Sequence, residues 1–278
     1  MKNLTLREKA RIYLEEQHLL DDYPFQVACK YSQTFVKNVI KRITAEDVEI
    51  EKIETQEHIL NPQGKEIITD VMVYAKDGTI YDLEPNTYRK GEVLERGIFH
   101  TGMMHSKLLQ PSEDWTELKR GVVIMLNKHD ILKHDKAVEK FELTHSDTKE
   151  KASEKGVVLY MVNCSQRGRG KEEKDFFHDL MADYVKEELY FSENKTVVDY
   201  ILGREEQYKM TERQERMIEN ERKEAAREAA KKAAKKAKVE TTRDILKTLI
   251  DNGFDASAIS KALNLSNADI NKITKKLC

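Results

Sequence analysis

The segment from residue 64 to residue 89 constrains the fold of this chain most, because it has the pattern of a β-hairpin. Residues 67–75 are rich in β-branched and aromatic side chains, which favour strands. The pair Asp77-Gly78 follows, and it favours a tight primed turn, which needs a positive φ at its centre. Residues 79–84 form the second strand-like stretch. The sequence therefore predicts two adjacent antiparallel strands.

Acidic and amide side chains recur on these two predicted strands. Asp70 lies in the first strand, on the same face as Met72 and Tyr74. In the second strand, period-2 alternation puts Asp82, Glu84 and Asn86 on one face. A face with these three side chains is a poor core face, but their oxygen atoms suit hard divalent cations held near phosphate.

Residues 70–86, DVMVYAKDGTIYDLEPN, carry an Asp-x13-Glu-x-Asn pattern across the hairpin. This pattern resembles the PD-(D/E)XK nuclease superfamily and, more closely, its recombination-promoting nuclease or PD-(D/E)XK family transposase branch. Three other segments resemble motifs of that branch in the same order: LDDYPFQVAC from Leu20, LERGIFHTGMMHSKLL from Leu94 and EDWTELKRGVVIML from Glu113. The resemblance covers residues 17–210.

The resemblance implies a restriction-endonuclease-like α/β/α core and Mg²⁺-dependent hydrolysis of DNA phosphodiester bonds, with Mn²⁺ as a second usable ion. Asp70 and Glu84 would be catalytic metal ligands, and Asn86 would orient water or contact phosphate. Asp82 is a candidate accessory acid, although the resemblance does not carry catalysis onto it. Backbone oxygen also binds Mg²⁺, so the carbonyl of Leu83 or Pro85 is a further candidate ligand. The candidate phosphate contacts are Lys65, Lys90 and Arg96.

The sequence departs from the family pattern at four positions, and these departures leave catalysis open. Asn86 stands where the branch has Gln and the wider superfamily has Lys, and Pro85 precedes it. Ile98 replaces an arginine and His105 replaces an aspartate. The alternative function is therefore a catalytically impaired homologue that binds DNA or protein. Asp70 and Glu84 would then be ordinary polar residues on a solvated sheet face.

Hydrophobic patterning predicts an α/β fold around this hairpin. The expected helices span residues 4–19, 32–43, 89–109 and 175–190, and the other expected strands span 48–60, 121–126, 138–144 and 156–162. The apolar run at 121–126 is typical of a buried central strand. Helices before and after a continuous sheet favour three α/β/α layers.

Two weaker signals concern the histidines and a basic loop. His100 and His105 are five residues apart, as are His129 and His134, which is the wrong spacing for one helix face. We expect these side chains to be exposed or internally hydrogen-bonded. The loop at residues 166–171, QRGRGK, is either an exposed turn or a contact to a DNA backbone.

The C-terminal third has a different composition from the rest of the chain. We expect a nuclease-like domain at residues 1–202, a charged Ala/Lys/Glu-rich helix at 203–238 and a helix-turn-helix-like tail at 239–278. Eight Lys or Arg residues lie between 221 and 238. The tail offers four candidate DNA contacts: Asn267, Asn271, Lys272 and Lys275. Partner docking or self-association through these helices is the alternative.

The composition adds expectations about location. Charged residues make up 35% of the chain, yet the formal net charge is only −2, so any attraction to DNA depends on local clusters. The sequence has no apolar run of transmembrane length and no signal-peptide core, so we expect no membrane partner. Cys29, Cys164 and Cys278 are scattered, which favours a reducing, cytoplasmic setting.

Overall fold

The computed structural model describes residues 4–59, 67–88, 92–109, 112–168 and 170–204, together with residues 218, 220, 223, 225–234, 240–241, 244–245, 248–249 and 252–253. The chain divides into two compact units, Met1–Lys209 and Met210–Cys278. Six of the candidate contact residues lie outside the described residues: Lys65, Lys90, Asn267, Asn271, Lys272 and Lys275.

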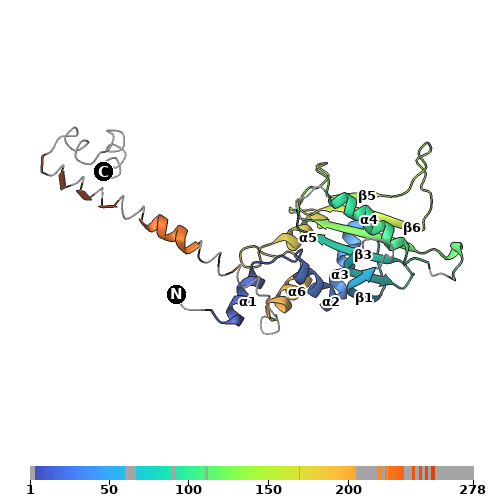
Figure 1. Cartoon of the computed structure of the whole chain (residues 1–278), viewed down its shortest axis with the longest axis horizontal. Helices are drawn as coiled ribbons and strands as arrows, with labels where there is room; N and C mark the ends of the chain where they lie inside the picture. Colours follow the sequence, from blue (N-terminus) through green and yellow to red (C-terminus); the bar gives the residue numbers. More distant parts are fainter. Residues whose placement is uncertain are drawn as a thin grey trace. The chain divides into compact units, whose positions relative to one another are not determined.

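The described strands of the first unit form a six-stranded mixed sheet in the order β1-β2-β3-β4-β6-β5 (Figure 1). The strands are β1 (Ile50–Ile59), β2 (Ile67–Ala75), β3 (Ile80–Asn86), β4 (Arg120–Asn127), β5 (Val138–Phe141) and β6 (Gly156–Asn163). The strands β3, β4 and β6 are parallel to one another, whereas β1, β2 and β5 pair in antiparallel fashion. The predicted α/β class and the hairpin of β2 and β3 are therefore confirmed.

The turn between β2 and β3 differs from the expected primed turn. The Gly78 N–H donates to the Ala75 carbonyl (3.0 Å), and the Ala75 N–H donates to the Thr79 carbonyl (2.9 Å). Gly78 has a φ of 87°, while Asp77 accepts a hydrogen bond from the Thr79 N–H (2.9 Å). These bonds define a three-residue turn that needs a left-handed residue only at Gly78.

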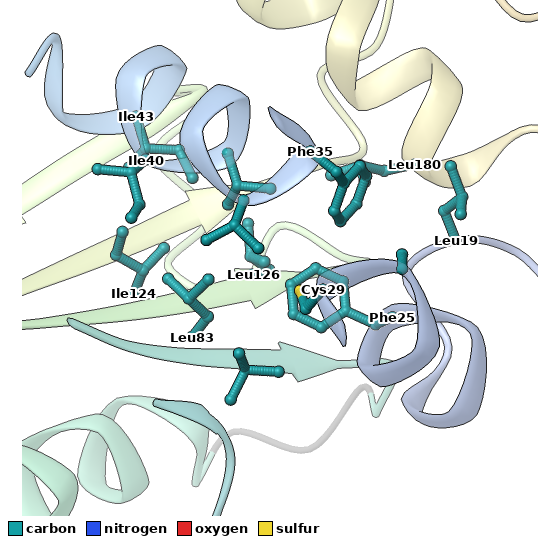
Figure 2. Close-up of a cluster of buried hydrophobic side chains, with 14 of the residues drawn as sticks. Leu19, Phe25, Cys29, Phe35, Ile40, Ile43, Leu83, Ile124, Leu126 and Leu180 are labelled. Carbon is teal, nitrogen blue, oxygen red and sulfur yellow. The ribbon is translucent and has the colours of Figure 1, made fainter. Parts of the chain in front are cut away.

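Helices cover both faces of this sheet (Figure 1). They are α1 (Leu6–Glu15), α2 (Asp22–Tyr31), α3 (Gln33–Thr44), α4 (Val93–His105), α5 (Glu172–Met181) and α6 (Ser192–Leu202). The helices α2, α3, α5 and α6 contribute to the larger core, and Figure 2 shows Ile40 and Ile43 of α3 pointing toward Leu83 and Ile124 of the strands. The helix α4 covers the other face.

The smaller core lies between α4 and this second face. Val93 and Met104 of α4 pack there with Val123 and Met125 of β4. Because successive strand residues point to opposite faces, β4 serves both cores, and its residues Val123 to Leu126 have no exposed surface. A strand buried on both faces explains the continuous apolar run seen at residues 121–126.

The helix predictions were only partly right. The helix α2 was not predicted, although Pro24 in its first turn and the spacing of Phe25, Ala28 and Cys29 are typical of a buried helix. The single helix expected at 175–190 is wrong, because α5 ends at Met181. Asp183 then accepts hydrogen bonds from the backbone N–H groups of Val185 and Lys186, which forms a turn before α6.

The second unit is described only in part. Residues 225–234 are helical, as the Ala-rich and charged sequence predicts. The boundaries of the three expected segments remain predictions. Among the residues described here, no helix combines the length and the apolar character needed to cross a membrane.

Candidate active site on the β2–β3 hairpin

Asp70 and Glu84, the two acids predicted from the hairpin, lie together in the structure. The ladder of β1 and β2 is interrupted opposite Asp70, at Gln56, whose φ is 57°. The Asp70 N–H donates instead to Glu84 Oε1 at 2.8 Å. The pairing of β2 with β3 ends at Leu83, so Pro85 lies beyond it and its missing N–H costs no bond to β2.

The face that carries Asp82, Glu84 and Asn86 is buried, which contradicts the expectation of a solvated or poorly packed face. Asp82 and Glu84 have no exposed surface, and Asn86 is 3% exposed. The helix α4 covers them, a tertiary contact that strand alternation alone does not reveal. Buried carboxylates require partners, and α4 supplies two of them.

Arg96 and His100 are these partners, and they lie one helical turn apart on α4. Arg96 Nη2 donates to Glu84 Oε2 at 2.6 Å. His100 Nδ1 lies 2.9 Å from Asp82 Oδ2 and 3.8 Å from Glu84 Oε1. Sequence reasoning named Arg96 but left His100 out of the site. The four-residue spacing between the two was the signal that could have found it.

Burial sets the electrostatics of this cluster. It raises the pKa of Asp82 to about 7, and it raises the pKa of Glu84 well above its usual range, with the neighbouring Asp82 carboxylate adding to the shift. Burial and then the Asp22 carboxylate raise the pKa of Asp70. Burial also lowers the pKa of His100, which favours the neutral imidazole. These shifts all favour the neutral forms of the buried side chains.

The helix α2 reaches the site from the opposite side. Gln26 Nε2 donates to Asp70 Oδ1 at 3.2 Å. An amide donor orients the Asp70 carboxylate without neutralising it. The unpredicted helix therefore positions one of the two predicted acids.

Asn86 belongs to a row of three buried asparagines at the carboxyl ends of β3, β4 and β6. Asn86, Asn127 and Asn163 occupy paired register positions on these parallel strands. Asn86 Nδ2 donates to Asn127 Oδ1 at 2.9 Å. The side-chain amide of Asn86 is thus held by its neighbour. Sequence reasoning missed Asn127 and Asn163, although each directly follows a buried apolar run.

An open groove of about 800 Å³ has Asn86, Tyr88, Arg96, Phe99 and His100 in its lining, whereas Asp70, Asp82 and Glu84 are not among its lining residues. Arg96 and His100 contact the buried acids and also line the groove, so they connect the acids with the groove.

Comparisons with protein-family models, curated proteins and solved structures found no match.

Two sets of side chains in this site have the chemistry to hold a divalent cation. The first is the predicted pair of Asp70 and Glu84. The second is Asp82, Glu84 and His100, each of which offers a ligand atom within 4.8 Å of the other two. Glu84 belongs to both sets.

Three other features that the sequence analysis singled out lie apart from these ligand sets. Ile98 is 56% exposed on α4. The exposed His105 has its Nδ1 2.8 Å from the Thr101 carbonyl of its own helix. In the basic loop, Arg167 Nη1 lies 3.3 Å from Glu187 Oε2. None of these three is among the residues that contact the acids.

Proposed function

We propose that this chain is a Mg²⁺-dependent DNA endonuclease of the recombination-promoting nuclease type, with a restriction-endonuclease-like core and with Mn²⁺ as an alternative ion. One observation carries the proposal: Asp70 and Glu84 meet on adjacent central strands, and Arg96, which donates to Glu84, lines a groove. With Asp82, these two acids place three carboxylates around a single guanidinium, that of Arg96. Burial disfavours the charged forms of these acids, and a bound dication would stabilise them.

The residues present fit such an ion. Carboxylate oxygens are the ligands that Mg²⁺ prefers, and the Asp70 N–H donates to Glu84 Oε1 at 2.8 Å, so the two acids lie close together. Asp70 and Glu84 would hold the ion. When bound, Mg²⁺ supplies charge neutralisation at the phosphate and lowers the pKa of a bound water.

The other side chains have distinct roles in this proposal. The Arg96 side chain is 40% exposed and lines the groove, so its guanidinium is placed to contact a DNA phosphate as well as Glu84. Gln26 orients Asp70, and Asn127 holds the amide of Asn86 where Asn86 lines the groove.

Plasmid nicking tests the proposed activity. Supercoiled DNA is incubated with the full chain in Mg²⁺, Mn²⁺ or EDTA, and Asp70→Asn is compared with the wild type. Asp77→Asn is the matched control, since Asp77 lies in the exposed turn of the same hairpin. We expect cleavage in either metal ion by the wild type and the control, and a loss of about 100-fold or more in Asp70→Asn. Intact plasmid after incubation with the folded wild type would refute the proposal.

A second function has its own supporting observation. Asn86 Nδ2 is engaged by Asn127, and Arg96 is engaged by Glu84, so neither is free in the way a catalytic lysine would be. A non-catalytic homologue that binds DNA or protein accounts for this arrangement. It predicts DNA binding that EDTA leaves unchanged, and a loss of binding on chelation would count against it.

A further inference from the structure

Asp82, Glu84 and His100 form a buried cluster of one nitrogen and two carboxylate ligand groups. None of the three is more than 2% exposed. His100 Nδ1 lies 2.9 Å from Asp82 Oδ2 and 3.8 Å from Glu84 Oε1. Ligand atoms around one tetrahedral ion with bonds of about 2.1 Å are separated by roughly 3.4 Å. The 2.9 Å contact is shorter than that spacing and the 3.8 Å separation is longer, and all three ligand atoms lie within 4.8 Å of one another.

A second, independent observation points to a ligand at this cluster. Asp82 Oδ1 is buried, and no hydrogen-bond partner for it lies among the described residues. A carboxylate oxygen without a partner in the interior is costly and calls for an explanation. A cation beside His100 and Glu84 would satisfy this oxygen.

We propose that Asp82, Glu84 and His100 form a three-ligand centre for a first-row transition metal ion of the Zn²⁺ or Co²⁺ type. Imidazole suits these ions better than Mg²⁺, which prefers oxygen ligands. Three protein ligands leave a fourth position open, as in catalytic zinc sites. The inference rests on the proposed function in one respect, since the centre shares Glu84 with the Asp70–Glu84 pair.

The charges and the neighbouring groove are consistent with this centre. Two carboxylates balance the two charges of the ion, so a neutral imidazole completes the set without excess charge. Glu84 Oε2 contacts Arg96 while Oε1 faces His100, so the arginine and the ion use different oxygens. His100 also lines the groove, so one of the three ligands borders open space.

Titration with Co²⁺ tests the inference, because bound Co²⁺ absorbs visible light. The full-length chain is titrated with Co²⁺ alone, and Zn²⁺ or Mg²⁺ is then added in excess. His100→Asn keeps a donor near the position of Nδ1 but removes the imidazole. His134→Asn is the matched control, because His134 Nδ1 also lies 2.9 Å from a carboxylate, that of Glu139.

We expect one Co²⁺ per chain, displaced by Zn²⁺ but not by a similar concentration of Mg²⁺. Affinity should fall by about 10-fold or more in His100→Asn and Asp82→Asn, and stay unchanged in His134→Asn. X-ray absorption of the zinc-loaded wild type should show scattering from an imidazole, a readout that holds even if a variant does not fold. Absence of Co²⁺ binding, binding that the two variants leave unchanged, or a zinc spectrum without imidazole would overturn the inference.

The results also separate this inference from the proposed function. Mg²⁺-dependent cleavage without Co²⁺ binding would refute the transition-metal centre and leave the nuclease in place. Co²⁺ binding that depends on His100, in a chain that cleaves no DNA with any of these ions, would refute the nuclease and leave the metal centre.

Discussion

At the scale of single residues, Glu84 connects most of the site. One of its oxygens accepts the Asp70 N–H, and the other accepts from Arg96. Its carboxylate is buried, so each of these contacts replaces hydration that the folded chain has removed. Any change to one partner therefore alters the protonation and the orientation of Glu84 as well.

Removal of the Arg96 charge should destabilise the protein. Arg96→Gln leaves Glu84 buried with fewer hydrogen-bond donors. We expect a loss of about 1–3 kcal/mol in the free energy of unfolding. This loss is smaller than that for a fully buried ion pair, because the Arg96 side chain is 40% exposed. Urea denaturation at neutral pH measures this loss. Arg167→Gln, which alters a more exposed ion pair, serves as the control. Equal stability of Arg96→Gln and wild type would contradict the assigned contact.

The raised pKa of Asp82 predicts a pH dependence of stability. The folded state holds the Asp82 proton up to about pH 7, whereas an unfolded aspartate loses it near pH 4. Ionisation therefore costs folding free energy, and this cost grows between these two values and is complete above pH 7. The test compares the free energy of unfolding of Asp82→Asn with that of the wild type in EDTA. We expect this difference to shift in favour of Asp82→Asn by about 2–3 kcal/mol when the pH is raised from 5 to 8. Denaturation at both pH values measures it, and an identical difference at both would be inconsistent with the burial of this acid.

Part of the site followed from local sequence and part did not. Asp70 and Glu84 were predicted because they match the Asp-x13-Glu-x-Asn pattern on a hairpin that the Asp77-Gly78 turn indicates. The roles of His100 and Asn127 depend on how α4 and β4 pack on β3, which no local pattern specifies. Their sequence signals are short spacings that many surface residues share.

At the scale of elements, the site depends on how closely α4 approaches the sheet. Gly97 follows Arg96 on this helix, and a Cβ at that position would lie 3.1 Å from Leu159 and 3.2 Å from Met125. The absent side chain allows α4 to lie near β4 and β6. Arg96 and His100 reach the buried acids from this position.

A bulky side chain at Gly97 should therefore disturb both stability and the site. We expect Gly97→Leu to lower the free energy of unfolding by about 1–3 kcal/mol, through overpacking, and to weaken binding of metal ions by moving His100. Gly102→Leu is the control on the same helix, since a Cβ there meets nothing within 4 Å. Thermal denaturation and metal titration of both variants provide the test. A similar effect of the two substitutions would contradict the role of Gly97.

The sequence predicted elements well where one pattern dominated. The hairpin, β4, β6 and α3 have strong periodicity or continuous apolar runs, and all are present. The helix α2 was missed because its pattern is short and contains Pro24. The break between α5 and α6 depends on hydrogen bonds of Asp183, which helix propensity does not capture.

At the scale of the whole molecule, the site lies entirely within one of two compact units. All the acids, Arg96 and His100 belong to Met1–Lys209. The second unit, Met210–Cys278, contains the charged helical residues 225–234 and no residue of the described site. The composition of the sequence predicted that a charged, Ala-rich segment begins near this boundary. It did not determine whether the tail contacts DNA or a protein partner, or through which residues.

A chain that ends at Lys209 should therefore fold and keep the site. We expect its thermal midpoint to lie within a few degrees of that of the full chain, and its metal-dependent cleavage to persist, because no described core residue of the sheet comes from the second unit. Circular dichroism and plasmid nicking check both points, and light scattering shows whether the second unit drives self-association. Loss of the folded signal in the truncated chain would contradict the independence of the first unit.

The central claim is that the hairpin acids hold a metal ion for cleavage of DNA. The most direct measurement compares Glu84→Gln with the wild type in Mg²⁺ and Mn²⁺, with cleavage rate and bound DNA determined in the same samples. The account predicts that cleavage falls by about 100-fold or more while DNA binding changes little. Equal cleavage by the two proteins, or cleavage by the wild type that continues in EDTA, would contradict it.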